Sequence, residues 1–318
     1  MHIGIITPAA PGSLSGNRAT ATRWAGFLRE LGHRVSIHVD YHGEAYDCMV
    51  ALHAWRSAEA IEMFKRHHPS RPLIVAMTGT DLYRFINSHP EPTLQSIELA
   101  DRLVTLHDLA WRVLPAAARD RIHVIHQSAV PLPQPPKRSV RHFDVCVAGH
   151  LRDEKDSLRT ACAVRDLPAN SRIRVLHYGK AHTDAWAVMA KAEMKTNTRY
   201  HWYGEVPHWQ LRRAYGRCHA LVLSSVMEGG ANVISEATVA GLPVIASDID
   251  GSVGLLGEDY EGYYPVQDTD ALRALLLKIE SDPDYEKRLT EQCKQRAALF
   301  TRTAEKKGWA DLLEAIAA

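Results

Sequence analysis

The sequence predicts an α/β protein made of two doubly wound, Rossmann-like domains that face one another across a cleft. Short apolar runs alternate with helical patterns along the 318 residues, which is typical of parallel sheets covered by helices. The alternation stops at a proline-rich stretch, 130–139, and then restarts. The length also suits two domains of roughly 150 residues better than one core. Because ligands bind beyond the carboxyl ends of such strands, we expect the functional residues there.

The first predicted domain covers residues 1–135. It opens with a strand, 3–7, followed by a loop rich in proline and glycine, 8–17. Apolar residues from Ala21 to Leu31 then recur at helical spacing, and Gly32 is a natural stop for that helix. Further strands are predicted at 35–39, 48–52, 73–77, 103–106 and 122–125.

The second predicted domain covers residues 140–300. Four prolines within 131–136 make a stiff connector that leads into it. We expect a last helical segment, 301–318, to pack back on the first domain. Within the second domain, strands are predicted at 143–148, 173–176, 220–224 and 243–247, and helices at 268–279 and 285–300.

The composition excludes several classes of protein. Hydrophobic residues make up 46%, and 38 Lys and Arg balance 37 Asp and Glu. A disordered chain needs less apolar content, and a nucleic-acid binder needs a basic surplus. No apolar run approaches the ~18–20 residues of a bilayer span, and the first residues read as a strand, not a signal peptide. The five cysteines are scattered, which argues against a disulfide framework or a zinc site. We expect a cytoplasmic protein.

Histidine is unusually frequent. The chain has 18 histidines, so its net charge would climb steeply below about pH 6.5.

The strongest functional signal lies at 221–237. A strand there ends in a Gly-rich turn and starts a helix, with Glu228 in the loop and Glu236 early in the helix. The backbone N–H groups of 229–233 form a ready anion site, where a diphosphate would have a carboxylate on either side. A lone glutamate would more often be a solvated charge. The glycines, the spacing and the Gly-Leu-Pro-Val that follows at 241–244 outweigh that interpretation.

Two further loops carry positive charge. The turn 148–156 follows the first strand of the second domain and can aim Arg152 and Lys155 at a diphosphate leaving group. The loop 12–18 precedes the first helix, and its amides can cradle an anion. Arg18 places a positive charge at the positive end of the helix dipole, which is unfavourable. An anionic ligand bound there would explain this position.

The Glu-x7-Glu element followed by Gly-Leu-Pro-Val resembles the C-terminal signature of the retaining family-four glycosyltransferases, which have the two-domain GT-B fold. The resemblance implies that Glu236 holds the nucleotide ribose and that Glu228 contacts the donor sugar. Lys155 matches the family's Glu-Lys-Gly segment, but His150 stands where Arg is usual and Asp156 where Gly is usual. Arg152 is shifted by two residues from the family's arginine.

The charges and loops described above, together with the resemblance, give the following candidate residues. The catalytic candidates are Lys155, Arg152, Glu228 and Arg18. The donor-binding candidates are Gly16, Gly149, Val206, Glu228, Gly229, Gly230, Ala231, Asn232, Val233 and Glu236. The acceptor-side candidates are Ser15, Asn17, Arg18, Thr78, Gly79, Thr80 and His107.

Other segments resemble the family less closely or have plainer explanations. Thr78 to Asp81 resembles the family's His-Gly-Thr-Asp, with Thr78 in place of His. His107 and His126 follow predicted strands, and a purely structural role is about as probable for each. The turn 203–207 resembles the family's base-binding turn, whereas Trp202, Trp209 and Tyr215 near it are more typical of a core.

We expect neither a metal nor a cofactor. Asp248-Ile249-Asp250 is a D-x-D pattern, which binds a divalent metal in a different glycosyltransferase fold. Here it follows a strand and ends at Gly251, in a family loop beside the diphosphate. Lys155 and helix amides can neutralise the leaving group instead.

Several motifs together resemble one subgroup, the selenosugar synthases of selenoneine biosynthesis. They lie at 7–9, 15–18, 77–83, 125–128 and 149–156. The resemblance implies that selenophosphate is joined to a UDP-sugar, typically UDP-N-acetylglucosamine, to give a 1-selenosugar with release of UDP and phosphate. A selenium nucleophile is already deprotonated, so no general base is required. The partners expected are therefore small molecules, with no nucleic acid and no membrane insertion.

Two other functions remain open from the sequence. One is a conventional family-four transferase that acts on a hydroxyl or amine. The other is a non-catalytic nucleotide-sugar-binding protein. The sequence leaves the sugar, the anomeric outcome and the oligomeric state undecided.

Overall fold

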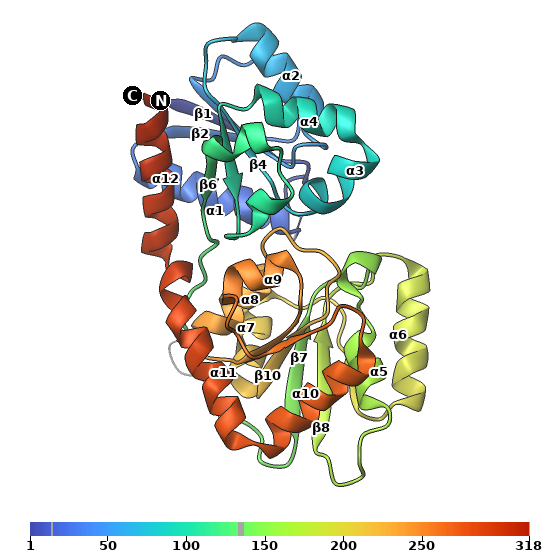
Figure 1. Cartoon of the computed structure of the whole chain (residues 1–318). Coiled ribbons are helices and arrows are strands. Elements are labelled where there is room, and N and C mark those ends of the chain that lie inside the picture. The colour runs from blue at the N-terminus through green and yellow to red at the C-terminus, as the bar shows by residue number, and fades with distance from the viewer. Residues whose placement is uncertain (14, 133–136, 318) are drawn as a thin grey trace. The chain divides into compact units, whose positions relative to one another are not determined.

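The computed structural model describes residues 1–13, 15–132 and 137–317 (Figure 1). Residue 14 of the predicted anion loop, residues 133–136 of the predicted connector and residue 318 lie outside this description. The chain forms two compact units. Unit 1 contains Met1–Gln127, Glu228–Gly230 and Arg302–Ala318, and unit 2 contains Ser128–Met227 and Ala231–Thr301.

Unit 1 is built on a six-stranded parallel sheet in the order β2-β1-β3-β4-β5-β6. Its strands are β1 (His2–Ile6), β2 (Arg34–His38), β3 (Cys48–Leu52), β4 (Leu73–Ala76), β5 (Arg102–Thr105) and β6 (Ile122–Val124). Its α-helices are α1 (Gly16–Glu30), α2 (Ala58–His67), α3 (Ile86–Ser88), α4 (Pro90–Leu99) and α12 (Arg302–Ala317). A π-helical turn covers Asp81–Phe85, and 3₁₀ turns cover Ala110–Arg112 and Ala116–Arg121.

Both faces of this sheet are buried, which explains its continuous apolar strands. Along β3, Cys48, Val50 and Leu52 join the core that α1 and α12 cover. Met49 and Ala51 point the other way, into the core with residues of α2 and α4. This alternation follows from the two-residue period of a strand.

Helix α12 belongs to unit 1 although it comes last in the chain (Figure 1). The rings of Trp24 and Trp309 meet edge to face at 4.8 Å. Buried Glu305 accepts hydrogen bonds from Trp24 Nε1 at 2.8 Å and Arg23 Nε at 3.0 Å. These contacts anchor α12 on α1.

Unit 2 has a second parallel sheet, in the order β12-β11-β10-β7-β8-β9. Its strands are β7 (Phe143–Ala148), β8 (Ile173–Tyr178), β9 (Tyr200–Trp202), β10 (Ala220–Leu223), β11 (Val244–Ser247) and β12 (Tyr263–Tyr264). Its α-helices are α5 (Arg159–Val164), α6 (Asp184–Thr196), α7 (His208–Arg217), α8 (Asn232–Val239), α9 (Asp250–Leu256), α10 (Thr269–Ser281) and α11 (Pro283–Arg296). Turns of 3₁₀ helix cover Asp153–Lys155 and Ala297–Phe300.

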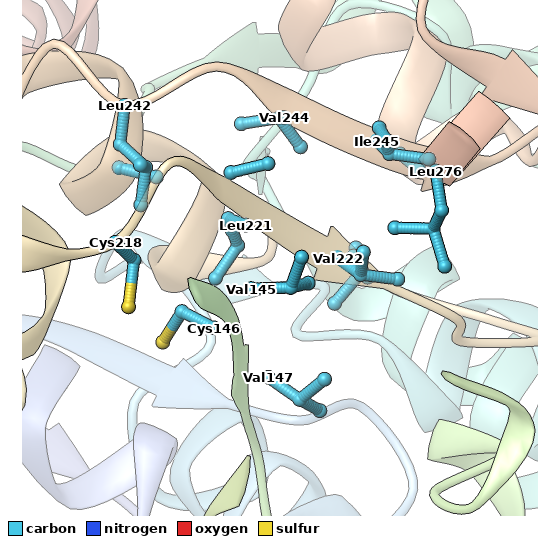
Figure 2. Packing of buried hydrophobic residues seen from close by; sticks show 14 of the residues in the cluster. Val145, Cys146, Val147, Cys218, Leu221, Val222, Leu242, Val244, Ile245 and Leu276 are labelled. Carbon is cyan, nitrogen blue, oxygen red and sulfur yellow. The ribbon is translucent and has the colours of Figure 1, made fainter. Parts of the chain in front are cut away.

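The core of unit 2 centres on β7 and β10 (Figure 2). Val145, Cys146 and Val147 of β7 lie beside Leu221 and Val222 of β10 in this core. Burial raises the pKa of the Cys146 thiol well above its usual range, and the neighbouring Cys218 thiol adds to the effect. Cys146 therefore behaves as a small apolar residue.

The strand orders locate the positions at which each sheet can bind a ligand. Counted within unit 2, the strands follow the dinucleotide-binding order 3-2-1-4-5-6, which reverses between β7 and β10. In unit 1 the order reverses between β1 and β3. Loops at such reversals splay apart and leave room for a ligand at the carboxyl ends of the strands.

The predicted α/β fold of two Rossmann-like domains is confirmed. The sequence missed the short edge strands β9 and β12 and ended β8 two residues early. The helix predicted at 285–300 is instead α11 followed by a 3₁₀ turn. Within the part of the chain that the structure describes, none of the helices has the length and apolarity of a membrane span.

Candidate functional site

Gly149, at the end of β7, is held from both sides. Its N–H donates to the Tyr178 carbonyl at 2.9 Å, and its carbonyl lies 3.1 Å from His177 Nε2. Because a carbonyl only accepts, Nε2 carries the proton, and Nδ1 accepts from the Tyr200 hydroxyl at 2.9 Å. Burial lowers the pKa of His177 to about 4, so this imidazole is neutral near pH 7. These hydrogen bonds fix the position of Gly149, the first residue of the loop after β7.

The turn that carries Lys155 is tied to β10. Ser224 Oγ, just after β10, lies 3.0 Å from the Lys155 carbonyl and 3.1 Å from the Asp156 carbonyl. Val226 N–H donates to the Glu154 carbonyl at 2.9 Å. Asp156 ends the turn in the left-handed conformation, with φ 43° and ψ 52°. The turn that carries Lys155 therefore lies where the strand order of the sheet reverses, between β7 and β10.

A pocket opens at the carboxyl ends of β7, β8 and β10 in unit 2. The aliphatic part of Lys155 runs over Gly149, since a Cβ on that glycine would lie 3.7 Å from Lys155 Cδ. The lining residues are Val147, Ala148, Gly149, Lys155, Ser157, His177, Val222, Leu223, Ser224 and Ser225. His177 was not predicted from the sequence.

Arg152 lies at the start of the same turn. Its backbone N–H donates to Ser157 Oγ at 3.0 Å. Its Nε is buried, 3.9 Å from Glu154 Oε2, and has no hydrogen-bond partner among the described residues. His150 is neutralised, because burial lowers its pKa. Arg152 and Lys155 are therefore the two cations that this turn offers to an anion.

Glu236 lies in α8 and its carboxylate is held by two residues of α7. Oε2 accepts from the Tyr215 hydroxyl at 2.9 Å, and Oε1 lies 3.0 Å from His208 Nε2. The hydrogen bond to Glu236 raises the pKa of His208. Tyr215 is buried, as predicted, and it contacts a site residue, which was not predicted. No local pattern reveals this pairing, because it depends on how α7 packs beside α8.

The start of α8 suits an anion. Its N-cap residue is Ala231, whose side chain has no oxygen to accept from the first helical amides. Asn232 and Val233 are the first two residues of the helix. Val206 lies on the chain just before α7, beyond Gly204, which has a φ of +69°.

The remaining donor candidates lie in unit 1 with the acceptor candidates. Glu228, Gly229 and Gly230 belong to that unit. A Cβ on Gly229 would lie 2.4 Å from Gly79 Cα, so no side chain fits there. Gly230 has a φ of +156°, which a side chain rarely adopts.

Helix α1 begins with the predicted loop residues Gly16, Asn17 and Arg18. Ser15 is its N-cap, and its hydroxyl accepts from the Arg18 N–H at 3.5 Å. No acidic residue offsets Arg18 in the first turn of this helix. Arg18 Nη1 is buried and has no hydrogen-bond partner within the described ranges. An orphaned guanidinium nitrogen at a helix start favours an anionic ligand.

Thr78 and Gly79 have their amides occupied by a side chain of their own loop. The buried Asp81 carboxylate accepts from the Thr78 N–H at 3.0 Å and from the Gly79 N–H at 2.7 Å. Thr80 Oγ1 lies 2.9 Å from Nε2 of His53, a buried residue with a φ of 75°. His53 was missed by the sequence analysis, although it follows β3 directly. Its Nδ1 accepts from the backbone of Arg56 at 3.1 Å, so Nε2 donates to Thr80.

His107 and His126 follow β5 and β6 as predicted. His107 is buried, and its Nε2 lies 2.9 Å from the Tyr83 hydroxyl. His126 Nε2 lies 3.1 Å from Asp108 Oδ1. Asp250 of the D-x-D pattern is the first residue of α9. Among the described residues, no group of three or more His, Cys, Asp or Glu is arranged to hold a metal ion.

A family model described as glycosyl transferases group 1 matches residues 133–296, just over half of the chain. The chain belongs to this family. The match includes the turn with Lys155, both glutamates and the start of α8. No curated protein sequence matches this glycosyltransferase.

Solved structures resemble this glycosyltransferase along its whole length. HepE from Anabaena, in complex with UDP and glucose, has 14% identity and a TM-score of 0.76 over 99% of this chain and 100% of HepE. Sucrose-phosphate synthase from Thermosynechococcus elongatus has 16% identity and a TM-score of 0.77, with 99% and 98% covered. A glycosyltransferase from Rickettsia africae has 15% identity and a TM-score of 0.76, again with 99% and 98% covered. These likenesses establish the GT-B fold.

Proposed function

We propose that this glycosyltransferase uses a UDP-sugar, with UDP-N-acetylglucosamine as the first candidate, and joins its sugar to selenophosphate. One observation carries the donor assignment. The turn with Arg152 and Lys155 follows β7, where a sheet with dinucleotide-binding strand order reverses, and α8, which follows the neighbouring strand β10, starts without a side-chain cap. The similar fold of HepE has been solved with UDP-glucose, which supports the choice of UDP.

Each donor group has a chemical counterpart in this chain. Arg152 presents a buried Nε that makes no hydrogen bond within the described residues, and Lys155 presents a point charge, so both suit the diphosphate. The first amides of α8 add partial positive charge without a metal. In this proposal Glu236 accepts from the ribose hydroxyls and Glu228 from the sugar.

The reaction needs positioning and charge stabilisation but no general base. Selenium attacks the anomeric carbon, and the bond from that carbon to the diphosphate oxygen breaks with its electron pair going to UDP. Water then cleaves the selenium–phosphorus bond and leaves phosphate and the selenosugar. Two unit charges held 4 Å apart repel by about 1 kcal/mol in water and more in a site with less water. The cations Arg152 and Lys155 offset that repulsion and stabilise the leaving group.

The acceptor assignment rests on the subgroup resemblance together with Arg18. Its buried Nη1 has no partner in the described part of the chain, and a small phosphate-bearing acceptor would supply one. A conventional transfer to a hydroxyl or amine is the second candidate. It is favoured by the likeness to sucrose-phosphate synthase, whose name describes a carbohydrate product.

One assay separates these functions. The protein is incubated with UDP-N-acetylglucosamine and either selenophosphate, phosphate or a panel of small hydroxyl and amine acceptors. UDP release and a selenium-bearing hexosamine by mass spectrometry, with selenophosphate only, are expected. Turnover with hydroxyl acceptors alone would establish the second candidate. Binding of the UDP-sugar without cleavage in any mixture would identify a non-catalytic binder.

Two variants test the site assignment with different readouts. Lys155→Ala removes charge from the leaving group and should lower kcat by about 10²- to 10³-fold with a smaller effect on donor binding. Glu236→Ala should weaken UDP binding about ten- to a hundredfold, because hydrogen bonds to a charged group are lost. The control is Lys191→Ala, which removes an exposed lysine of α6. Full activity in both site variants would contradict the assignment.

A further inference from the structure

The two oxygens of the Glu236 carboxylate have different environments. Oε2 faces Tyr215, which is 1% exposed, and accepts from its hydroxyl at 2.9 Å. Oε1 faces His208, whose side chain is 65% exposed, at 3.0 Å. One end of the carboxylate is thus held inside the core and the other lies at the surface of unit 2.

Tyr215 is a fixed donor. It belongs to the core of unit 2, on the face of α7 that packs against the sheet. Burial raises the pKa of Tyr215 well above its usual range, and the charge of Glu236 adds to this. The phenol therefore keeps its proton at any working pH. Because a carboxylate can only accept, the Tyr215 hydroxyl donates to it.

His208 is a replaceable partner by comparison. It is the first residue of α7, and its imidazole lies mostly in solvent. Its hydrogen bond to Oε1 can be exchanged for one from a ligand hydroxyl at little cost, because the imidazole then bonds to water. Exchange at Oε2 would instead leave the buried Tyr215 hydroxyl without an acceptor, which is unfavourable.

We propose that Tyr215 is a positioning residue for ribose recognition, which holds Oε2 of Glu236 so that Oε1 is presented to the ribose hydroxyls in place of His208. This inference rests on the proposed function of the same site. Its physical basis is preorganisation: a glutamate side chain that is already fixed loses little rotamer freedom when the nucleotide binds. Without Tyr215 the carboxylate would have to be ordered by the ligand.

The test compares UDP with 2′-deoxyuridine diphosphate by calorimetry on the full chain. The wild-type protein should prefer UDP by about tenfold or more. Tyr215→Phe keeps the ring and should reduce that preference to about threefold or less, mainly by weakening UDP binding. In turnover, the KM for the UDP-sugar should rise while kcat at saturation changes little, a split that general loss of structure would not produce.

Tyr285→Phe is the matched control. Tyr285 is also buried in unit 2, and its hydroxyl donates to the Glu261 carbonyl at 2.9 Å, away from Glu236. It should keep the wild-type preference. If Tyr215→Phe unfolds, Glu236→Gln provides a second test. Its amide oxygen would turn to Tyr215 and its NH₂ would face the ribose, which should also reduce the preference, because the ribose hydroxyls lose their charged acceptor.

The outcomes separate the two proposals. A Tyr215→Phe protein that keeps the wild-type preference, or a Glu236→Gln protein that does so, would overturn the positioning role and leave the UDP-sugar assignment standing. Equal binding of the two nucleotides by the wild type would overturn the ribose role of Glu236, and the inference with it. Absence of UDP binding by the wild type would overturn the proposed donor and the inference together.

Discussion

At the scale of single residues, Asp156 shows how a departure from the family pattern is accommodated. Glycine is usual at this position in the family that the sequence resembles, and the backbone here is left-handed, with φ 43°. Asp is one of the few residues with a side chain that visit this region readily. Its carboxylate also pairs with Arg159, with Oδ2 2.7 Å from Nε. The substitution is therefore compatible with the turn that carries Lys155.

Two variants of Asp156 separate backbone strain from the ion pair. Asp156→Gly loses the pair with Arg159 but relieves the left-handed backbone, so its free energy of unfolding should stay within about 1 kcal/mol of wild type. Asp156→Val loses the pair and forces a β-branched residue into that conformation. It should lose about 2 kcal/mol or more. Urea unfolding measures both, and equal stability of the two variants would show that the turn imposes no such constraint.

Under the proposed role of Glu236, we expect His208 to make donor binding dependent on pH. The hydrogen bond to Glu236 raises its pKa above the usual 6.5, against the effects of burial and of Arg212. Below that raised pKa the imidazolium holds the carboxylate by a charge-assisted hydrogen bond, and above it the weaker neutral bond remains. Cys146 and Tyr215 also interact electrostatically with Glu236 and stay protonated throughout, because burial raises their pKa values.

The KM for the UDP-sugar should therefore fall, by about threefold, as the pH rises through the His208 pKa. His208→Gln has no titrating group and should flatten that part of the profile. Steady-state kinetics from pH 6 to 9 would measure both proteins. A variant that keeps the wild-type slope would assign the titration to another group.

At the scale of elements, the loop after β7 depends on a close approach by the loop after β8. Gly179 has a φ of +151°, and a Cβ there would lie 1.9 Å from the Gly149 carbonyl oxygen. Its N–H donates to the Gly204 carbonyl at 2.8 Å, and its carbonyl accepts from Trp202 Nε1 at 2.8 Å. Three strand ends are thus linked through one glycine.

Gly179→Ala should displace Gly149 and with it the turn that carries Lys155. We expect a loss of roughly 3 kcal/mol or more in stability and weaker UDP binding. Gly257→Ala is the control, because that glycine also has a positive φ, +97°, but no atom lies within 4 Å of an added Cβ. Thermal unfolding and calorimetry with UDP compare the two. Similar losses in both variants would mean that only the backbone conformation matters.

Some elements could be predicted from the sequence and others could not. Strands such as β3 and β7 were predicted with their observed bounds, because buried parallel strands are continuous apolar runs. The edge strand β12 has two residues, too few for a pattern. Lys155, Glu228 and Glu236 lie in contiguous motifs and could be proposed from sequence. Tyr215, His208, His177 and His53 could not, since each reaches its partner only through tertiary packing.

At the scale of the whole molecule, the many histidines make the fold sensitive to acid. Several are held neutral, since burial lowers their pKa values below the usual 6.5. They are His33, His53, His123, His150, His177, His201 and His219. Near pH 6.5 these histidines bind protons in the unfolded chain but stay unprotonated in the folded state. Folding stability therefore rises with pH across this window and falls as the pH drops below it.

His177 should account for a measurable share of this effect. With a folded pKa of about 4 against 6.5, it alone should remove about 2 kcal/mol of stability between pH 7 and pH 5. Urea unfolding at the two pH values should show that loss in the wild type and a smaller loss in His177→Gln. The variant itself should be less stable at pH 7, because the hydrogen bonds to Gly149 and Tyr200 are altered. An unchanged pH dependence would assign acid sensitivity to the other histidines.

The position of α12 has a consequence for the order in which the protein is made. Synthesis on the ribosome delivers Trp24 early, whereas its partners Glu305 and Trp309 emerge some 280 residues later. The last segment of unit 2 ends at Thr301, so that unit can close first. Until α12 arrives, the face of α1 that carries Trp24 stays open to solvent and to chaperones. The half of the protein that is translated first therefore cannot complete its core until the last helix has emerged.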